Sequence, residues 1–202
     1  MVVNKTTGLI LLAAGGSSRL GRPKQLLVYE GQPLLRRAAE TALASQCQPV
    51  IVVLGAEAEA CRVALQGLPV RIVVNSNWQE GLASSIRAGI AVLEKENSFI
   101  AGAILSVADQ PHLTAPLLNC LMVQQQATGK KIIAAHYAGV PGPPALFDLS
   151  FFAQLKTLHG DEGARRVLQE NPGEVAFVPF PEGSLDVDTA GDYEKLQRAP
   201  AK

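Results

Sequence analysis

The sequence has few cysteines, no excess of charge of either sign, and no long hydrophobic run. Its three cysteines, Cys47, Cys61 and Cys120, lie far apart in the chain and form no CxxC pair. We therefore expect neither a disulfide framework nor a zinc cage, and a reducing cytoplasm is the expected location. Lys plus Arg and Asp plus Glu each number 18, so the formal net charge is zero and no nucleic-acid partner is expected.

No apolar run approaches the roughly 18 residues that cross a bilayer, so no membrane partner is expected either. Residues 1–7 lack the apolar core of a secretory signal peptide, and we expect them, like 198–202, to form a loose terminus. Hydrophobic residues make up 48% of the 202 positions, which is ample for one core. The sequence therefore predicts a single domain over residues 1–202.

Short runs rich in Val, Ile and Leu alternate with longer segments of helical periodicity. Because these runs are almost continuously apolar, they predict strands that are covered on both faces. The alternation predicts right-handed βαβ units, and hence an α/β fold: a three-layer αβα domain with a mostly parallel, Rossmann-like sheet. The predicted strands are 8–13, 49–55, 70–75, 102–107, 131–137 and 175–180, and the predicted helices are 33–45, 57–67, 82–96, 114–126, 162–170 and 190–197.

A glycine-rich loop follows the first predicted strand, where such sheets bind ligands. The sequence reads AAGGSSRLGRPK over residues 13–24. Its small residues let a ligand approach the backbone, and successive N–H groups can form an anion-binding nest. The loop does not match the dinucleotide fingerprint G-x-G-x-x-G, and Arg22 and Pro23 stand where a P-loop requires Lys and Ser or Thr.

The loop instead follows the pattern A-A-G-x-S-x-R-x-G-x-x-K, and in this it resembles the MobA-like nucleotidyltransferase family, which includes the molybdenum cofactor enzymes. Three further segments resemble that family: NWQEGLASSIRAG (77–89), SVADQPHL (106–113) and LDVDTAGDY (185–193). The resemblance therefore extends from residue 8 to about 197. It implies a sheet of the nucleotide-diphospho-sugar transferase type, and the triplet Ala13-Ala14-Gly15 favours the cytidylyl-transferring branch over the guanylyl-transferring one.

The resemblance also implies the roles of individual residues. Arg19 and Lys24 are the expected catalytic cations: Arg19 binds the β- and γ-phosphates, and Lys24 stabilises the transition state. Asp109 and Asp188 are the expected ligands of magnesium (Mg2+), and Asp186 is a further candidate. The expected nucleotide-binding residues are Ala13, Ala14, Gly15, Gly16, Ser17, Ser18, Gly21, Gly81 and Ser85.

Several residues have two interpretations in the sequence. Arg22 is either a third phosphate-binding cation or a solvated surface residue, and Trp78 either stacks on a ligand ring or packs in the rim. The segment 139–147 resembles an acceptor-side loop, although Gly-Pro-Pro replaces the Gly-His-Pro of many relatives. In 159–168, Arg165 or Arg166 reaches an anionic acceptor, or the segment is a capped surface helix.

The function that the resemblance implies is transfer of CMP from CTP to a molybdopterin acceptor, with release of pyrophosphate. A molybdoenzyme or its maturation chaperone is a possible transient partner under this hypothesis. Three alternatives stay open. The first is transfer from GTP or another triphosphate to a different small phosphate acceptor. The second is a nicotinamide-dependent oxidoreductase, because some relatives are described in that way, and the third is a catalytically silent nucleotide sensor.

Overall fold

A seven-stranded sheet forms the centre of the computed structural model, which describes residues 5–17, 20–96, 99–187 and 189–198. The strand order is β5-β4-β1-β6-β8-β7-β9. Only β8 runs antiparallel to its neighbours among these strands, so the predicted mostly parallel sheet is confirmed. The strands are β1 (Thr6–Ala13), β4 (Val50–Leu54), β5 (Arg71–Val74), β6 (Ile100–Val107), β7 (Ile132–Tyr137), β8 (Val140–Asp148) and β9 (Val175–Pro179).

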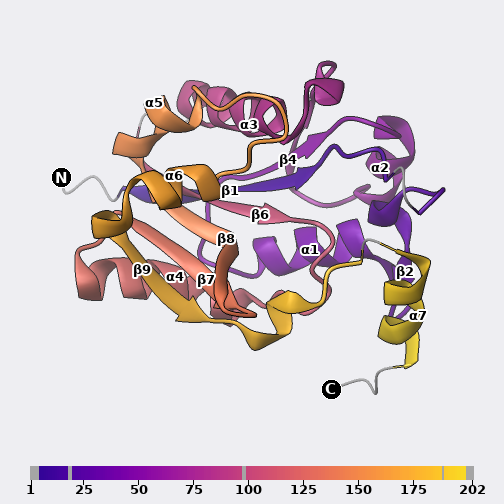
Figure 1. The fold of residues 1–202 in the computed structure, drawn as a ribbon. Coiled ribbons are helices and arrows are strands. Elements are labelled where there is room, and N and C mark those ends of the chain that lie inside the picture. Colours follow the sequence, from indigo (N-terminus) through magenta and orange to yellow (C-terminus); the bar gives the residue numbers. More distant parts are fainter. Residues whose placement is uncertain (1–4, 18–19, 97–98, 188, 199–202) are drawn as a thin grey trace.

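Helices cover both faces of this sheet, and Figure 1 shows α3, α5 and α6 above it and α1 and α4 below it. Because successive strand residues point to opposite faces, Leu9 and Leu11 join one core cluster and Ile10 and Leu12 the other. One cluster contains side chains of α1 (Leu34–Leu43), α2 (Ala58–Ala64) and α4 (Ala115–Thr128). The other contains side chains of α3 (Leu82–Glu96), α5 (Phe152–Leu155) and α6 (Arg165–Glu170). The predicted three-layer αβα fold is therefore confirmed.

The register places the carboxyl ends of the central strands at one edge. Ala13 pairs with Leu54, and Leu54 pairs with Val74. On the other side of β1, Leu12 pairs with Val107. From β1 the chain first builds outward to β4 and β5, and α3 then returns it to β6. Open α/β sheets bind ligands beside such a reversal, beyond the carboxyl ends of the strands.

The largest correction to the predicted elements is β8. The segment 139–147, predicted as a loop, is mostly strand, because its second half pairs with β6 and β7 and is buried at Ala145, Leu146 and Phe147. Its first half carries the glycine and prolines that argue against a strand in sequence. The expected loose termini are also too long, since β1 begins at Thr6 and α7 ends at Arg198.

The C-terminal segment crosses the carboxyl edge of the sheet and ends beside a small hairpin. This hairpin is β2 (Val28–Tyr29) with β3 (Gln32–Pro33), and α7 (Ala190–Arg198) lies next to it (Figure 1). Tyr193 Oη and Gln197 Nε2 both donate hydrogen bonds to the carbonyl of Val28, at 2.8 and 2.6 Å. A third buried cluster joins the two parts; it contains Leu27, Tyr29, Leu34, Val187 and Leu196. No helix in the described part of the chain is both long and apolar enough for a bilayer span.

Candidate active site

The loop after β1 is shaped from inside by the buried side chain of Gln25. Its Nε2 donates to the carbonyls of Ala13 and Gly15 at 3.2 and 2.7 Å. Ser17 lies in the left-handed region with a φ of 51°, and its Oγ accepts a hydrogen bond from the backbone N–H of Lys24 at 2.9 Å. The amide of Gln25 therefore holds the start of the loop against its end. The sequence analysis missed this residue, whose one signal is a polar side chain among the apolar positions of KQLL.

We predict that Gln25→Glu weakens the loop. A carboxylate has no N–H to donate, so the two carbonyls would lose their partner, at a cost of about 1–3 kcal/mol. The Tm should fall by several degrees, at roughly 2–4 °C per kcal/mol for a chain of this size. The exposed Gln169 gives the control Gln169→Glu, which should leave the Tm unchanged. Equal Tm values for the two variants would contradict the role of Gln25.

A cavity of about 400 Å3 opens at the carboxyl ends of β1 and β6. It is lined by most of the residues that the sequence analysis assigned to nucleotide binding, catalysis and metal binding. Ser17 and Gly21 line a neighbouring open cavity of about 590 Å3 instead. Ser18, Arg19 and Asp188 lie outside the described residues. The assigned residues that line the first cavity are Ala13, Ala14, Gly15, Gly16, Lys24, Gly81, Ser85 and Asp109.

An ion pair between Lys24 Nζ and Asp109 Oδ2 lies at the wall of this cavity. Their side chains are only 24% and 14% exposed, so little water screens the pair. The other carboxylate oxygen, Asp109 Oδ1, is buried and has no hydrogen-bond partner among the residues that the structure describes. Such an oxygen suits a hard divalent cation.

No group of three His, Cys, Asp or Glu residues forms a cation cage within the described ranges. Sites for Mg2+ commonly use one or two carboxylates and complete the shell with phosphate oxygens and water. Asp109 lines the first cavity and can offer its unpartnered Oδ1 as such a ligand. Asp186, the further candidate, lines a second cavity instead. The amide of Val187 donates to the carbonyl of Asp109 at 3.4 Å, so the C-terminal segment passes beside the loop that carries Asp109.

Trp78 packs against Gly16, which lines the first cavity, and against Gly55, which lines the neighbouring open cavity. A Cβ on Gly16 would lie 3.1 Å from two atoms of its indole ring, and a Cβ on Gly55 would lie 2.6 Å from Trp78 Cβ. Trp78 thus packs on these glycines and also lines the cavity, and its stacking on a ligand ring stays a prediction. Arg22 is exposed, and its guanidinium lies 5.0 Å from the ring centroid of Tyr193 on α7.

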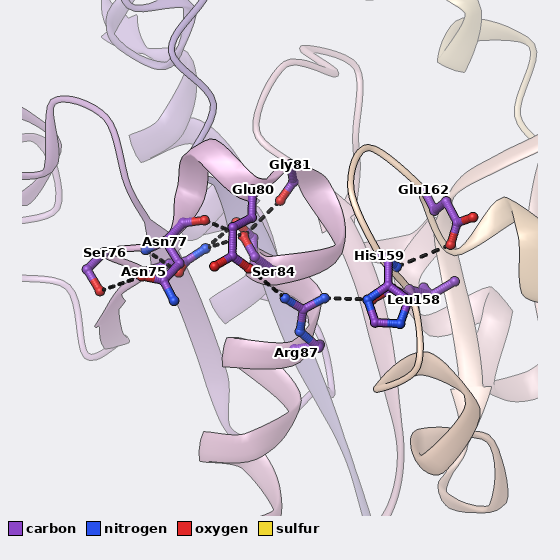
Figure 2. A network of polar contacts seen from close by, with 11 residues as sticks. Asn75, Ser76, Asn77, Glu80, Gly81, Ser84, Arg87, Leu158, His159 and Glu162 are labelled. Carbon is purple, nitrogen blue, oxygen red and sulfur yellow. Dashed lines mark hydrogen bonds and ion pairs between the residues drawn. The ribbon is translucent and has the colours of Figure 1, made fainter.

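A polar network at the start of α3 holds Gly81 and Ser85, which line the first cavity (Figure 2). Asn75 Nδ2 donates to Ser84 Oγ at 2.8 Å and to Ser85 Oγ at 3.1 Å. Ser84 Oγ in turn lies 2.8 Å from the carbonyl oxygen of Gly81. Gly81 has a φ of 100°, and a Cβ there would collide with the carbonyl of Gly160. The glycine is therefore required by chain packing, and its contact with a nucleobase stays a prediction.

A second cavity, of about 370 Å3, adjoins the first and shares Leu12, Leu82 and Val107 with it. Arg165 lines it, whereas Arg166 points away and pairs with Glu162 and Glu170 at 2.5 and 2.8 Å. The structure thus separates two arginines that the sequence left equivalent. The opposite wall is formed by the start of β8 and its neighbours: Tyr137, Val140, Pro141, Gly142, Pro143 and Asp186.

Gln110 joins the loop of Asp109 to this second cavity. It is buried, and its Nε2 lies 3.1 Å from Tyr137 Oη, 3.2 Å from the carbonyl of Pro143 and 3.2 Å from that of Gly183. The amide therefore connects the end of β6 with β7, β8 and the C-terminal segment. The sequence analysis assigned no role to Gln110, because its partners are 27 to 73 residues away.

Tyr137 should make the stability of the protein sensitive to alkaline pH. Burial raises its pKa from 10.0 to about 12, and the charge of Asp186 adds to the rise. Between these values the unfolded chain loses the proton while the folded protein keeps it, so the free energy of unfolding falls as pH rises. Below pH 10 this contribution is fully present. Urea unfolding across that window should give a shallower pH dependence for Tyr137→Phe than for the wild type, and identical slopes would contradict it.

Comparisons with known proteins identify relatives over nearly the whole chain. Residues 9–175 match the family described as MobA-like NTP transferase domain. The nicotine blue oxidoreductase of Paenarthrobacter nicotinovorans is 36% identical, covering 93% of this chain and 94% of the relative. The molybdenum cofactor cytidylyltransferase of Escherichia coli is 27% identical, covering 91% and 92%.

Solved structures agree with the fold. The crystal structure of Rv0371c from Mycobacterium tuberculosis H37Rv superposes with a TM-score of 0.85 at 30% identity, covering 98% of this chain and 100% of that one. A structure of Rv0371c in complex with manganese superposes with a TM-score of 0.79 at 27% identity and the same coverage. A divalent cation is therefore bound by a relative of the same fold.

Proposed function

Because the chain belongs to the MobA-like NTP transferase family, we propose that it is a magnesium-dependent cytidylyltransferase, which transfers CMP from CTP to molybdopterin and releases pyrophosphate. One observation carries the proposal: Lys24 and Asp109 form an ion pair at the wall of a cavity, beside the exposed glycines of the loop after β1. A cation and a carboxylate with a free oxygen are the two groups that a triphosphate and its metal require. The family relationship supports nucleotidyl transfer, and the choice of CTP and molybdopterin is our proposal.

The two adjoining cavities suit two substrates that react at their boundary. In our proposal the triphosphate occupies the first cavity and the acceptor the second. An oxygen of the acceptor phosphate forms a bond to the α-phosphorus, and the bond from that phosphorus to the bridging oxygen breaks. Pyrophosphate leaves with the electron pair. The acceptor phosphate is already ionised near neutral pH, so no general base is needed.

The protein then acts by positioning and by electrostatic stabilisation. Lys24 lies at the first cavity and would neutralise charge that grows on the transferred phosphate and the leaving group. We assign Arg19 to the β- and γ-phosphates. Asp109 would hold the divalent cation through its free oxygen, with Asp188 as the proposed second ligand. When bound, that cation supplies positive charge to the phosphate oxygens.

The choice of CTP rests on the triplet Ala13-Ala14-Gly15 and on the relative that is named a molybdenum cofactor cytidylyltransferase. Isothermal titration with CTP, GTP, ATP and UTP tests it, and CTP should bind most tightly. Pyrophosphate release should then require CTP, Mg2+ and molybdopterin together. A clear preference for GTP would overturn the cytidylyl assignment. Binding of a triphosphate without turnover with any phosphate acceptor would instead indicate a nucleotide sensor.

A second candidate function is that of a nicotinamide-dependent oxidoreductase. The relative at 36% identity is named an oxidoreductase, and the second cavity presents Tyr137, Pro141 and Pro143 to a ring. Against it, the loop after β1 lacks the G-x-G-x-x-G fingerprint. Titration with NADH and NADPH discriminates the two, because tight binding of either, with no binding of CTP, would favour the oxidoreductase.

A further inference from the structure

A single turn, residues 158–163, contributes to the walls of both cavities. Asp161 lines the first cavity, and Gly163 lines the second. Arg165, which follows directly at the start of α6, also faces the second cavity. A shift of this turn would therefore move charged groups in both cavities at once.

The turn is attached to the start of α3 by three contacts. The backbone N–H of Ala83 donates to the carbonyl of Gly160 at 3.1 Å. Gly81 lies so close to Gly160 that only a residue without a Cβ fits. The third contact is Arg87, whose Nη1 donates to the carbonyl of Leu158 at 2.6 Å.

Arg87 also holds the other side of the first cavity. Its Nη2 lies 3.0 Å from the carboxylate of Glu80, in the 3-10 turn Trp78–Glu80 that precedes Gly81. Figure 2 shows Arg87 between these partners, with its planar head directed at both. A guanidinium can bind two acceptors in fixed directions, which a lysine cannot do with its single nitrogen.

We propose that Arg87 is a positioning residue of the transfer reaction: by joining Glu80 to Leu158 it holds the turn that forms the common wall of the nucleotide and acceptor cavities. This inference rests on the proposed function, because it assumes that both cavities are occupied during turnover. Arg87 lines neither cavity, so its effect is indirect. It acts on the substrates through Asp161 and Arg165.

A second ion pair made by a residue of α3 provides a structural control for the contacts of Arg87. Lys156 Nζ binds the carboxylate of Glu94 at 2.9 and 3.0 Å, and so joins α3 to the end of α5. Both residues lie outside the two cavities. Partly exposed pairs of this kind contribute little to stability. Lys156→Met therefore removes a comparable tie between neighbouring elements without touching the common wall.

The experiment compares Arg87→Met, Arg87→Lys and Lys156→Met with the wild type. Pyrophosphate release is measured with CTP, Mg2+ and molybdopterin, each varied in turn, together with the Tm and amide hydrogen exchange over 158–165. Arg87→Met should raise the KM for CTP and for molybdopterin roughly 10-fold, since small misplacements of binding groups are costly. Its kcat should change less, and exchange in the turn should become faster.

Arg87→Lys should recover part of the loss, because it restores a charge near Glu80 but cannot bind both partners with one geometry. Lys156→Met should match the wild type in both KM values. If Arg87→Met also matches the wild type in an active enzyme, the positioning role is wrong and the proposed function stands. If the wild type releases no pyrophosphate with any triphosphate and acceptor, the proposed function is wrong and this inference falls with it.

Discussion

The Lys24→Ala protein is expected to fold normally and to turn over about 10²–10³-fold more slowly than the wild type. Among the described residues that line the first cavity, Lys24 is the one basic side chain. Loss of one preorganised charge contact to a transition state costs roughly 2.7–4 kcal/mol. The fold should persist, because the contact of this residue with Ser17 is made by its backbone N–H and is retained by alanine. Steady-state pyrophosphate release and a thermal melt measure the two effects.

Lys130 provides the matched control for this variant. Its ammonium group also donates a hydrogen bond, at 2.6 Å to the carbonyl of Gly173, but it lies outside both cavities. Lys130→Ala should therefore leave turnover unchanged. The mechanism expects the charge contact to be worth about 10²-fold or more in turnover. It would be contradicted if Lys24→Ala turned over within about twofold of the wild type.

Asp109→Asn is expected to raise the Mg2+ concentration needed for half-maximal activity by at least about 10-fold, since even loss of outer partners of a metal ligand costs 10–100-fold in affinity. The substitution keeps the shape of the side chain and removes its charge. It also removes the carboxylate that pairs with Lys24, so both the ammonium group of Lys24 and the bound Mg2+ would be less well placed. Activity measured across a Mg2+ titration, with CTP held constant, gives the shift directly.

Asp148 offers the control for Asp109→Asn. It lies at the end of β8, which runs antiparallel to β6 and therefore ends at the edge of the sheet opposite to Asp109. Its carboxylate caps a short turn through the backbone N–H of Ser150 at 2.9 Å. Asp148→Asn should therefore change the Tm slightly and leave the Mg2+ titration unaltered. The same titration curve for Asp109→Asn and the wild type would show that Asp109 does not bind the metal.

Most of the fold could be predicted from local pattern, and β8 shows where that pattern fails. The strands β1, β4 and β6 are mostly apolar because both of their faces are covered, so their sequence indicates their burial. β8 begins with Val-Pro-Gly-Pro-Pro, which resembles a loop. Its place between β6 and β7 depends on pairing with residues that are distant in sequence.

The candidate site also contains residues that local sequence pattern predicts and residues that it does not. A loop pattern directly after a strand indicated Lys24, and an acidic residue at another strand end indicated Asp109. Parallel strands bring such ends to one edge, so their proximity followed from the fold class. Gln25, Asn75 and Gln110 were missed, because a buried amide is recognised by its partners and not by its neighbours in sequence. The roles of Lys24 and Asp109 in catalysis and metal binding remain predictions.

The sequence by itself determined the class of the fold, the family, and the edge of the sheet at which we place the proposed chemistry. These follow from periodicity and from a short motif, which are local properties of the chain. Only the tertiary structure decided that Arg165 faces a cavity and Arg166 does not, and that Arg87 ties Glu80 to Leu158. Such choices depend on which side of a helix meets which distant loop, and that is set by packing over the whole molecule.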